Sequence, residues 1–452
     1  MLRSKVKYLI SICAFLFLFN ISYSQNPSPS PDEILTTMQK VADWQLHNPI
    51  RFDITISNVD KTEQYSILWD GTFVRFRARE DGQKQYEDLD KDWRYLGKLV
   101  EQNVSFSEMP AKVQNTFVNE LNLDPASILK IEMCDKDTKG WETGAFFVGL
   151  EALSKVSKDD KYIEALKLIG EANDWKLGDR IYHADDHCVG QMYLYLYSIY
   201  NDLNMMANVQ MQFDWIIKNP HPQSLDYSEG KNRWSWCDAL FMSPPAWILL
   251  TNITGDEKYF NYMNNQWWQT TGHLYDKEEH LFYRDDRYYE KHEENGEKVF
   301  WSRGNGWVVS GLTRIIENFP EHGRDKEKYV NLFKEMMTKI KTIQPSDGLF
   351  RASLLDTQSH PIKEASGTAF FTYAAAWGVN NGILSKDEFL PFIKKSWGGL
   401  LGCINEEGKL VWTQLPGSEP GDVKEEYNAP YGVGAFLLAG SEIYKLTLTE
   451  NQ

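Results

Sequence analysis

One pattern recurs six times between residue 139 and the C-terminal end of the sequence, at intervals of roughly 45 to 70 residues. Each copy begins with small or polar residues and continues into a segment that is apolar on nearly all sides, which is typical of a helix buried on both faces. The six copies are WETGAFFVGLEALSKVSKD, YHADDHCVGQMYLYLYSIYND, WCDALFMSPPAWILLTNITGD, WSRGNGWVVSGLTRIIENFP, EASGTAFFTYAAAWGVNNG and PYGVGAFLLAGSEIYKL.

More polar, amphipathic helices lie between these copies; they include KYIEALKLIGEAN, EKYFNYMNNQWW, KYVNLFKEMMTKI and KDEFLPFIKKSWGGLLGC. Buried helices that alternate with amphipathic ones predict two concentric layers. We therefore expect residues 139–452 to form an all-α domain, an (α/α)6 barrel with six inner helices inside six outer ones. Residues 25–49 hold a Pro/Ser-rich linker and a helix at 32–47, which we expect to be an early outer helix.

Residues 50–138 have a different character and predict a small α+β insertion near the N-terminus. The stretches RFDITISNV and QYSILWDGTFVRFRARE are rich in β-branched and aromatic residues, and the second contains a DG turn that predicts a hairpin. SEMPAKVQNTFVNEL reads as an amphipathic helix, and SILKIEM as one more strand.

The first 24 residues have the features of a secretory signal peptide. MLRSKVKY is basic, LISICAFLFLF is a short apolar run, and small residues precede a cleavage point near Ser24–Gln25. The apolar run is short for a membrane span. We therefore expect an exported protein, periplasmic or extracellular, with no membrane insertion after cleavage. We expect the four remaining cysteines to be free, buried thiols rather than disulfides; they are Cys134, Cys188, Cys237 and Cys403.

The net charge of −16 argues against a nucleic-acid partner, because binding to phosphates needs a basic surface. The sequence contains no GxSxG elbow, Walker A loop, GxGxxG after a strand or HExxH, which excludes the corresponding hydrolase, NTPase, dinucleotide and zinc-protease classes. Aromatic residues make up 14% of the chain, and their rings suit sugar stacking as well as core packing.

The candidate functional residues gather where the inner helices begin, and Asp238 is the first of them. It stands in RWSWCDALFMSPPAW between Trp236 and Met242. Asp238 is either a helix N-cap or a catalytic acid. Burial by such apolar neighbours would raise the pKa of a carboxyl group, as a general acid requires.

Asp185 and Asp186 form a second candidate, with His183 and His187 beside them. Adjacent residues point in different directions, so we expect only one of the two acids to face a cleft. His183 and His187 are four residues apart, but they flank the expected helix start and so do not form the histidine pair of a helical zinc site; we expect no metal and no cofactor.

The stretch FWSRGNGW offers Trp301 and Trp307 for stacking on rings and Arg303 for clamping a carboxylate. The alternative is a structural turn in which Arg303 pairs with a neighbouring acid. The polar, aromatic stretch that contains Arg284 predicts a long connection with hairpin features, and a lid over a cleft is one interpretation of it. We expect Asp285 and Glu290 in this stretch to be solvated.

Taken in order, the motifs ADDHCVGQ, WCDALFMSPP, FWSRGNGW, EASGTAFF and YGVGAFLLA resemble the unsaturated glycuronyl hydrolases. The sequence is most similar to the unsaturated rhamnogalacturonyl hydrolases of glycoside hydrolase family 105, which are relatives of family 88. The resemblance covers about residues 139–445 and the helix at 32–47. It implies an (α/α)6 barrel and a substrate left by polysaccharide lyases, an oligosaccharide with a 4,5-unsaturated uronate at its non-reducing end.

The resemblance also implies roles for single residues. Asp238 would be the general acid/base that hydrates the C4=C5 bond, and the second acid would be one of Asp185 and Asp186, with Asp186 slightly favoured. The residues expected to contact the substrate are Trp236, Met242, Arg284, His187, Trp301, Arg303 and Trp307. Arg284 stands where family members often carry a histidine. The alternatives are another (α/α)6 enzyme, either a lyase or an inverting glycosidase, and a non-catalytic glycan-binding protein.

Overall fold

The structure is a computed structural model. It describes residues 29–47, 51–58, 62–68, 73–80, 83–87, 102–103, 105–108, 111–119, 122–135, 138–222, 224–321 and 323–450. The predicted signal peptide lies outside these residues.

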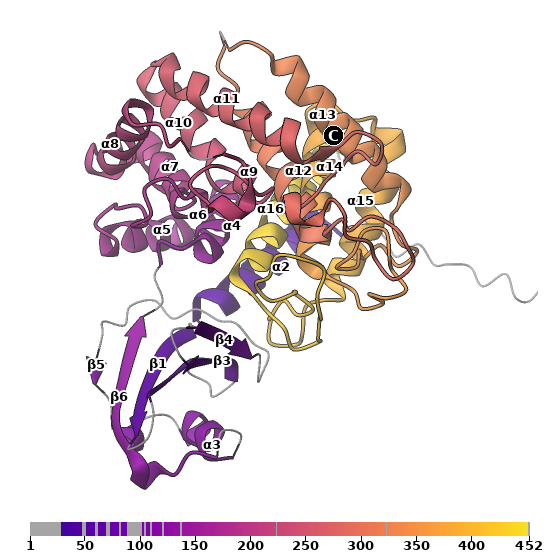
Figure 1. Ribbon diagram of the computed structural model, residues 1–452. Coiled ribbons are helices and arrows are strands. Elements are labelled where there is room, and N and C mark those ends of the chain that lie inside the picture. Colours follow the sequence, from indigo (N-terminus) through magenta and orange to yellow (C-terminus); the bar gives the residue numbers. More distant parts are fainter. Residues whose placement is uncertain are drawn as a thin grey trace, which may run out of the picture. The chain divides into compact units, whose positions relative to one another are not determined.

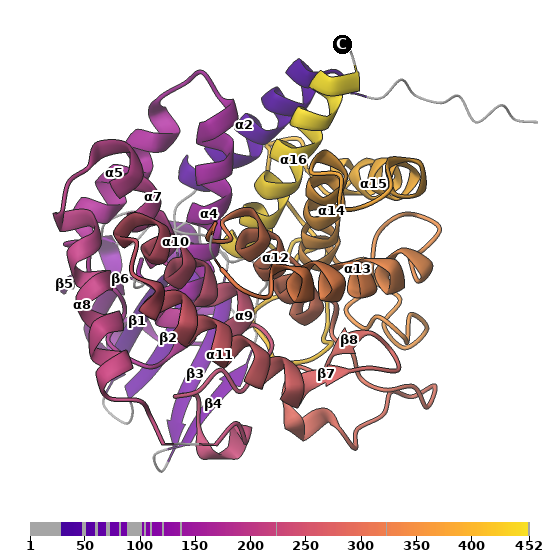
Figure 2. The same cartoon turned by 90° about the horizontal axis from the view of Figure 1, so that it is seen from above.

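In the part of the chain that the structure describes, six helices form the inner layer of a barrel. Figures 1 and 2 show these helices from two directions. They are α4 (Trp141–Val156), α7 (Gly190–Tyr200), α10 (Pro244–Thr254), α12 (Ser302–Glu317), α14 (Ala365–Asn380) and α16 (Pro430–Glu450). Each packs against the next in this order, and α16 packs against α4, which closes the ring. All six repeated segments of the sequence therefore supply an inner helix, as predicted.

In the described part of the chain, six outer helices surround the ring, and each packs mainly against one inner helix. In the order of their inner partners they are α5 (Lys161–Ala172), α8 (Asn204–Lys218), α11 (Glu257–Leu274), α13 (Lys326–Thr342), α15 (Lys386–Leu401) and α2 (Pro31–His47). Their buried residues follow helical spacing on one face, as in α13, where Tyr329, Phe333, Met336 and Ile340 are buried. The predicted (α/α)6 barrel is confirmed, with α2 as an outer helix.

Glycines let the first and last inner helices touch. A Cβ atom at Gly149 of α4 would lie 2.3 Å from the carbonyl oxygen of Gly434 in α16. A Cβ atom at Gly434 would lie equally close, 2.3 Å, to the carbonyl oxygen of Ala145. The backbones of α4 and α16 are thus in direct contact, and this contact closes the ring.

Two inner helices are preceded by a separate helical turn, α6 (Ala184–His187) before α7 and α9 (Ala239–Met242) before α10. Pro244 and Pro245 open α10 and separate it from α9, because proline is tolerated in the first turn of a helix but not in its interior. Both turns lie at the end of the barrel where inner helices begin, and both carry candidate acids.

An antiparallel six-stranded sheet occupies the predicted insertion, with the strand order β4-β3-β2-β1-β6-β5. Its elements are β1 (Arg51–Asn58), β2 (Thr62–Leu68), β3 (Phe73–Glu80), β4 (Gln83–Glu87), β5 (Gln102–Asn103), α3 (Ala111–Asn119) and β6 (Ile128–Asp135). β2 pairs with β3, with Gln64 opposite Arg77, in agreement with the predicted hairpin. The small α+β character of this segment is confirmed.

The connection between α11 and α12 contains a short hairpin of β7 (Tyr275–Asp276) and β8 (Leu281–Phe282), and a further bridge pairs His292 with Lys298. The predicted hairpin features are therefore present. No helix in the described part of the chain is long and apolar enough to cross a membrane.

Three cysteines, Cys188, Cys237 and Cys403, are free and buried, which confirms the prediction for these three. Burial raises the pKa of the Cys403 thiol to about 12. The side chain of Cys134 lies outside the description.

Candidate active site

Asp238 lies immediately before α9, in the position of a helix N-cap, but its carboxylate caps no backbone N–H. Its Oδ2 atom lies 3.3 Å from Nε of Arg284 and 3.6 Å from the thiol sulfur of Cys237, which donates to it. Only 8% of Asp238 is exposed. The carboxylate is therefore held beside a cation at the start of an inner helix, and it does not act as a cap.

Arg284 reaches Asp238 from the connection between α11 and α12. Its Nη1 atom donates to Oδ2 of Asp285 at 2.7 Å, and its carbonyl oxygen accepts from the backbone N–H of Cys237 at 2.8 Å. Burial disfavours the charge of Arg284, but the negative charge of Asp238, together with Tyr227 and Asp285, outweighs burial and raises the pKa of the guanidinium. The connection between α11 and α12 is thus held against the start of α9 by a backbone hydrogen bond to Cys237 and by the ion pair with Asp238.

Asp285 is fully buried, so the expectation that it is solvated is wrong; Glu290 is exposed, as expected. Burial works against the charge of Asp285, but hydrogen bonds from Arg287 and Arg284 outweigh it and hold the pKa of this carboxyl below its usual range. Asp285 therefore serves as the fixed anion that orients Arg284.

Asp185 is the acid of the α6 pair that interacts with Asp238. Burial is the main cause that raises the pKa of Asp185 to about 7, and the charges of Asp238 and Asp186 add to it. The positive charges of Lys231 and Arg180 oppose this rise. Asp185 therefore retains a proton near neutral pH in the neighbourhood of a second acid.

Asp186 is occupied by Arg180. Its Oδ2 atom accepts from the backbone N–H of Arg180 at 2.8 Å, and its Oδ1 atom accepts from Nε at 3.0 Å and also from Nη2. A Cβ atom at Gly178 would lie 2.5 Å from Oδ2 of Asp186, so the turn packs closely on the carboxylate. Asp186 fixes this turn, and the geometry favours Asp185 over the slightly preferred Asp186 as the second acid of the site.

Lys231 lies in the loop that leads to Asp238. Its ammonium group is 5.2 Å from the ring centre of Tyr227 and 5.5 Å from that of Trp236. Lys231 is half-buried and makes no ion pair or hydrogen bond with any residue that the structure describes. Lys231 thus has no ion-pair partner among the described residues, and its positive charge acts on the carboxyl group of Asp185.

His183 completes this group of residues. Its ring packs 5.0 Å from Trp236, and its Nδ1 atom accepts from the backbone N–H of Asp185 at 3.3 Å. Burial, with help from the positive charges of Arg180 and Lys231, lowers the pKa of His183 to about 2. His183 is therefore neutral, and it holds Asp185 through the backbone.

Arg303 is held by backbone carbonyl groups and aromatic rings. Its guanidinium is fully buried and donates to the backbone carbonyls of Gln414 at 2.7 Å and of Leu415 at 3.0 Å. It is also sandwiched by the rings of Trp301 and Tyr431, at 4.4 and 4.8 Å. Arg303 is a structural residue, as in the alternative of a structural turn, but its partners are carbonyl groups rather than an acid.

Trp301 and Trp307, the two tryptophans of the stretch FWSRGNGW, also lie in the core. Trp301 is 2% exposed and donates its indole N–H to Oε1 of Gln414 at 2.8 Å. Trp307 is fully buried and packs against Phe241, Phe370 and the half-buried ring of Trp141. Their expected role as stacking surfaces for a sugar is not supported by this packing.

Three further candidates are buried. Met242 and Trp236 are each 1% exposed, so they can only form the wall behind the acids. His187 is also 1% exposed, and both of its nitrogens are occupied, Nε2 by the carbonyl of Ile181 at 2.8 Å and Nδ1 by the hydroxyl of Ser243 at 2.7 Å. Burial lowers the pKa of His187 to about 4. His187 is therefore a neutral core residue, and its predicted contact with substrate is corrected.

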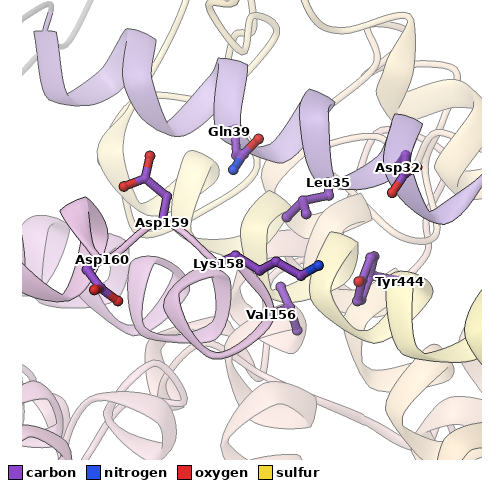
Figure 3. Close-up of a pocket in the computed structure, with 8 residues that line it drawn as sticks. All are labelled: Asp32, Leu35, Gln39, Val156, Lys158, Asp159, Asp160 and Tyr444. Carbon is purple, nitrogen blue, oxygen red and sulfur yellow. The ribbon is translucent and has the colours of Figure 1, made fainter.

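A surface hollow of about 700 Å³ lies elsewhere, among α2, α16 and the connection between α4 and α5 (Figure 3). Lys158 and Tyr444 line it together with three aspartates, and no candidate residue of the acid pair does. Among the described residues, no three His, Cys, Asp or Glu side chains gather in a group that could hold a metal ion.

Comparison with known proteins agrees with this fold and these motifs. A model of glycosyl hydrolase family 88 matches residues 111–447. A protein of Formosa agariphila named unsaturated 3S-rhamnoglycuronyl hydrolase is 38% identical over 321 residues, which are 68% of this chain and 84% of that protein. A protein of the same name from Alteromonas sp. is 36% identical over 323 residues, 68% of this chain and 78% of its own.

Solved structures are similar as well. A family 88 hydrolase from Bacteroides vulgatus has a TM-score of 0.63 at 28% identity, over 68% of this chain and 92% of its own. A protein described as polysaccharide lyase BACCELL_00875 has the same TM-score, 0.63, at 31% identity, and the match covers 68% of this chain and 91% of that protein. A possible family 105 member from Salmonella enterica shows the shared fold at 16% identity, with a TM-score of 0.63 over 94% of this chain and 97% of its own. The resemblance expected from the motifs is confirmed: this chain belongs to glycosyl hydrolase family 88.

Proposed function

We propose that this protein is a glycoside hydrolase that removes a 4,5-unsaturated uronic acid from the non-reducing end of oligosaccharides made by polysaccharide lyases. The observation that carries the proposal is a group of two acids and two cations: the buried Asp238 lies beside Arg284, and the half-buried Asp185 interacts with the charges of Asp238 and Lys231. The names of the two relatives support it, since both are called unsaturated 3S-rhamnoglycuronyl hydrolases.

The reaction begins at the C4=C5 bond, which belongs to an enol ether. Asp185 keeps a proton up to about pH 7, partly because the negative charge of Asp238 disfavours a second charge beside it, so the pair of acids carries one proton into the reaction. Asp185 transfers this proton to Asp238, and Asp238 donates it to C4, so that positive charge develops on C5 and the ring oxygen. Asp238 is thus the general acid, and Asp185 maintains the protonation of the pair.

Water then adds to C5, and the carboxylate of Asp238 accepts the proton that the water loses. The resulting hemiketal opens by breaking the bond between C5 and the ring oxygen, which leaves a ketone at C5 and a hydroxyl group on C1. The hemiacetal at C1 expels the aglycone as an alcohol and becomes an aldehyde. This course differs from ordinary glycoside hydrolysis, in which two carboxylates act at the anomeric carbon.

Arg284 and Lys231 are the groups that bind the carboxylate of the substrate. Nε of Arg284 is buried and close to Asp238, but it makes no hydrogen bond with a described residue. A substrate carboxylate that takes this donor, with Lys231 on its other side, replaces Asp238 as the partner of Arg284. Binding of the correct substrate thereby frees the catalytic acid.

The double bond absorbs ultraviolet light, so the reaction is tested by following that absorbance with lyase-generated disaccharides. We expect the wild-type protein to lower the absorbance, and Asp238→Asn to slow this loss roughly a hundred- to ten-thousandfold. Glu290→Gln, the same change on an exposed residue of the α11–α12 connection, is the control and should retain full activity.

The similarity to a protein described as a polysaccharide lyase gives a second candidate reaction. A lyase forms the double bond, so it would raise the absorbance of intact polysaccharide, whereas the proposed hydrolase lowers that of the unsaturated product. A protein that changes neither substrate would refute both enzymatic proposals and leave glycan binding alone.

We also propose that the protein is exported after removal of residues 1–24, on the basis of the basic and apolar composition of that segment. Mass spectrometry of the protein from its native host should find the mature N-terminus near Gln25. A mature chain that retains these residues would contradict this proposal.

A further inference from the structure

We infer that Tyr182, Trp215 and His221 form an aromatic platform that stacks the sugars which follow the unsaturated uronate. This inference rests on the proposed function, because it assigns the next subsite of the same substrate. We call these three residues the rim platform.

The rings of the rim platform touch one another. The ring of Tyr182 lies 5.5 Å from that of Trp215, and on its other side it meets His221 edge-on at 4.9 Å. The hydroxyl group of Tyr182 donates to the carbonyl oxygen of Asn219 at 2.6 Å. The side-chain amide of Asn232 lies 3.3 Å from Nε2 of His221. The platform is therefore fixed by polar contacts at both edges before any ligand binds.

The rim platform lies at the same end of the barrel as the two acids. Trp215 belongs to the last turn of the outer helix α8, and His221 follows in the connection from α8 to α9. Tyr182 belongs to the preceding connection, from α5 to α6, three residues before Asp185. Three peptide units span at most about 11 Å between Cα atoms, so the platform is within reach of the first sugars beyond the acid pair.

The exposure of Trp215 is the reason to assign a ligand. Trp215 is 43% exposed, and it is the only tryptophan in the described part of the chain that is so open to solvent. A large apolar ring left in water beside a site marks a binding surface more often than an isolated apolar residue does. The apolar face of a pyranose ring fits such a surface, and the hydroxyl groups at its edge can reach Asn232.

The carboxylate-binding residues do not contribute to this surface. Lys231 and Arg284 contact the ring of Tyr227, which belongs to a separate aromatic contact. The uronate and the sugars after it are thus recognised by different residues. Loss of the platform is therefore expected to affect only substrates that have a sugar after the uronate.

The test compares Trp215→Ala with the wild-type protein on two kinds of unsaturated substrate. One is a methyl glycoside of the unsaturated uronate, and the other is a series of unsaturated di- and tetrasaccharides. We expect Trp215→Ala to raise KM for the oligosaccharides roughly two- to tenfold and to leave kcat, and KM for the methyl glycoside, unchanged. The control is Tyr200→Ala, which removes another exposed aromatic ring at the opposite end of the barrel, where α7 ends.

An equal rise in KM for the methyl glycoside, or no rise for the tetrasaccharide, would overturn the inference. If the wild-type protein consumed no unsaturated substrate at all, the proposed function would fail instead. In that case, calorimetric binding of the same tetrasaccharide decides the platform: weaker binding by Trp215→Ala than by Tyr200→Ala supports it, and equal binding refutes it.

Discussion

The side-chain amide of Gln191 donates a hydrogen bond of 2.9 Å to the carbonyl oxygen of Phe241, three residues after Asp238. In a continuous helix this carbonyl would accept from the residue four positions later, but that residue is Pro245, which has no N–H. Gln191 thus supplies the missing donor from the neighbouring inner helix. The double proline frees the carbonyl groups of α9, and α7 satisfies one of them.

Gln191 is held in turn by buried charges. Its Oε1 atom accepts from Nε of Arg314 at 2.8 Å, and Nη2 of Arg314 lies 3.4 Å from Oε2 of Glu151. All three residues are buried, so each polar group depends on its partner. We therefore regard Gln191 as a positioning residue for the segment that carries Asp238.

Gln191→Leu should destabilise the protein and lower kcat. The change leaves the carbonyl of Phe241 and the Nε atom of Arg314 without these partners, which should cost about 2 kcal/mol or more in the free energy of unfolding. Because α9 is then free to shift, kcat should fall while KM changes little. Urea unfolding and steady-state kinetics measure the two effects.

Gln344→Leu is the matched control, because Gln344 also donates to a backbone carbonyl, that of Phe392 in the outer helix α15. It should lower stability without changing kcat. If both glutamine variants lowered kcat equally, the effect would be one of general stability and not of positioning.

Asp185→Asn should increase stability above neutral pH while it reduces activity. The pKa of Asp185 is about 7 in the folded protein and about 4 in an unfolded chain, so between these values the folded state binds more protons. The free energy of unfolding of the wild type therefore falls as pH rises through this window. Asparagine does not titrate and escapes this loss, which is about 4 kcal/mol.

The measurement is the difference in unfolding free energy between wild type and Asp185→Asn at pH 4 and at pH 8. The free energy of unfolding of Asp185→Asn should increase relative to that of the wild type as the pH rises. Asp186→Asn is the comparison, since it weakens the contacts with Arg180 and should lose stability with no such gain. A constant difference between wild type and Asp185→Asn would show that Asp185 does not hold a proton in the folded state.

Arg303→Leu should act on stability rather than on substrate binding. The substitution removes the two donors that hold the carbonyl groups of Gln414 and Leu415, which should cost about 2 kcal/mol or more. Thermal unfolding and KM are measured together. A large rise in KM with unchanged stability would instead restore the interpretation of Arg303 as a carboxylate clamp.

The barrel was predictable because its signal is local. A helix that is buried on both sides is apolar all round within its own segment, as in Ala365–Asn380, and six such segments leave little choice of architecture. Asp238 could be singled out for the same reason, since its apolar neighbours in the chain are also its neighbours in space.

The rest of the site depends on contacts between distant segments, which a single sequence does not display. Arg303 donates to the carbonyl groups of Gln414 and Leu415, which lie more than a hundred residues later in the chain. The sequence shows only that the residue is an arginine, and this residue type suggested a carboxylate ligand. Lys231 stands in a loop without a pattern, and its role appears only when the ring of Trp236 and the acids lie around it. The choice between Asp185 and Asp186 as the second acid likewise depends on the turn at Arg180, because this turn occupies the carboxylate of Asp186.

Arg284→Gln should abolish the preference for a charged substrate. Arg284 lies between Asp238 and the buried Asp285, and a charge-assisted hydrogen bond to the uronate is worth about 1.5–3 kcal/mol. KM for the unsaturated acid should therefore rise roughly ten- to a hundredfold. The methyl ester of the same substrate lacks the charge, so its KM should hardly change.

The readout is the ratio of kcat/KM for the acid to that for its methyl ester, which corrects for any general damage to the protein. Arg287→Gln provides the control, because Arg287 pairs with Asp285 but makes no contact with Asp238 in the described structure. It should lower stability and keep the ratio of the wild type. If Arg284→Gln also kept that ratio, Arg284 would not bind the carboxylate, and Lys231 alone would have to fill this role.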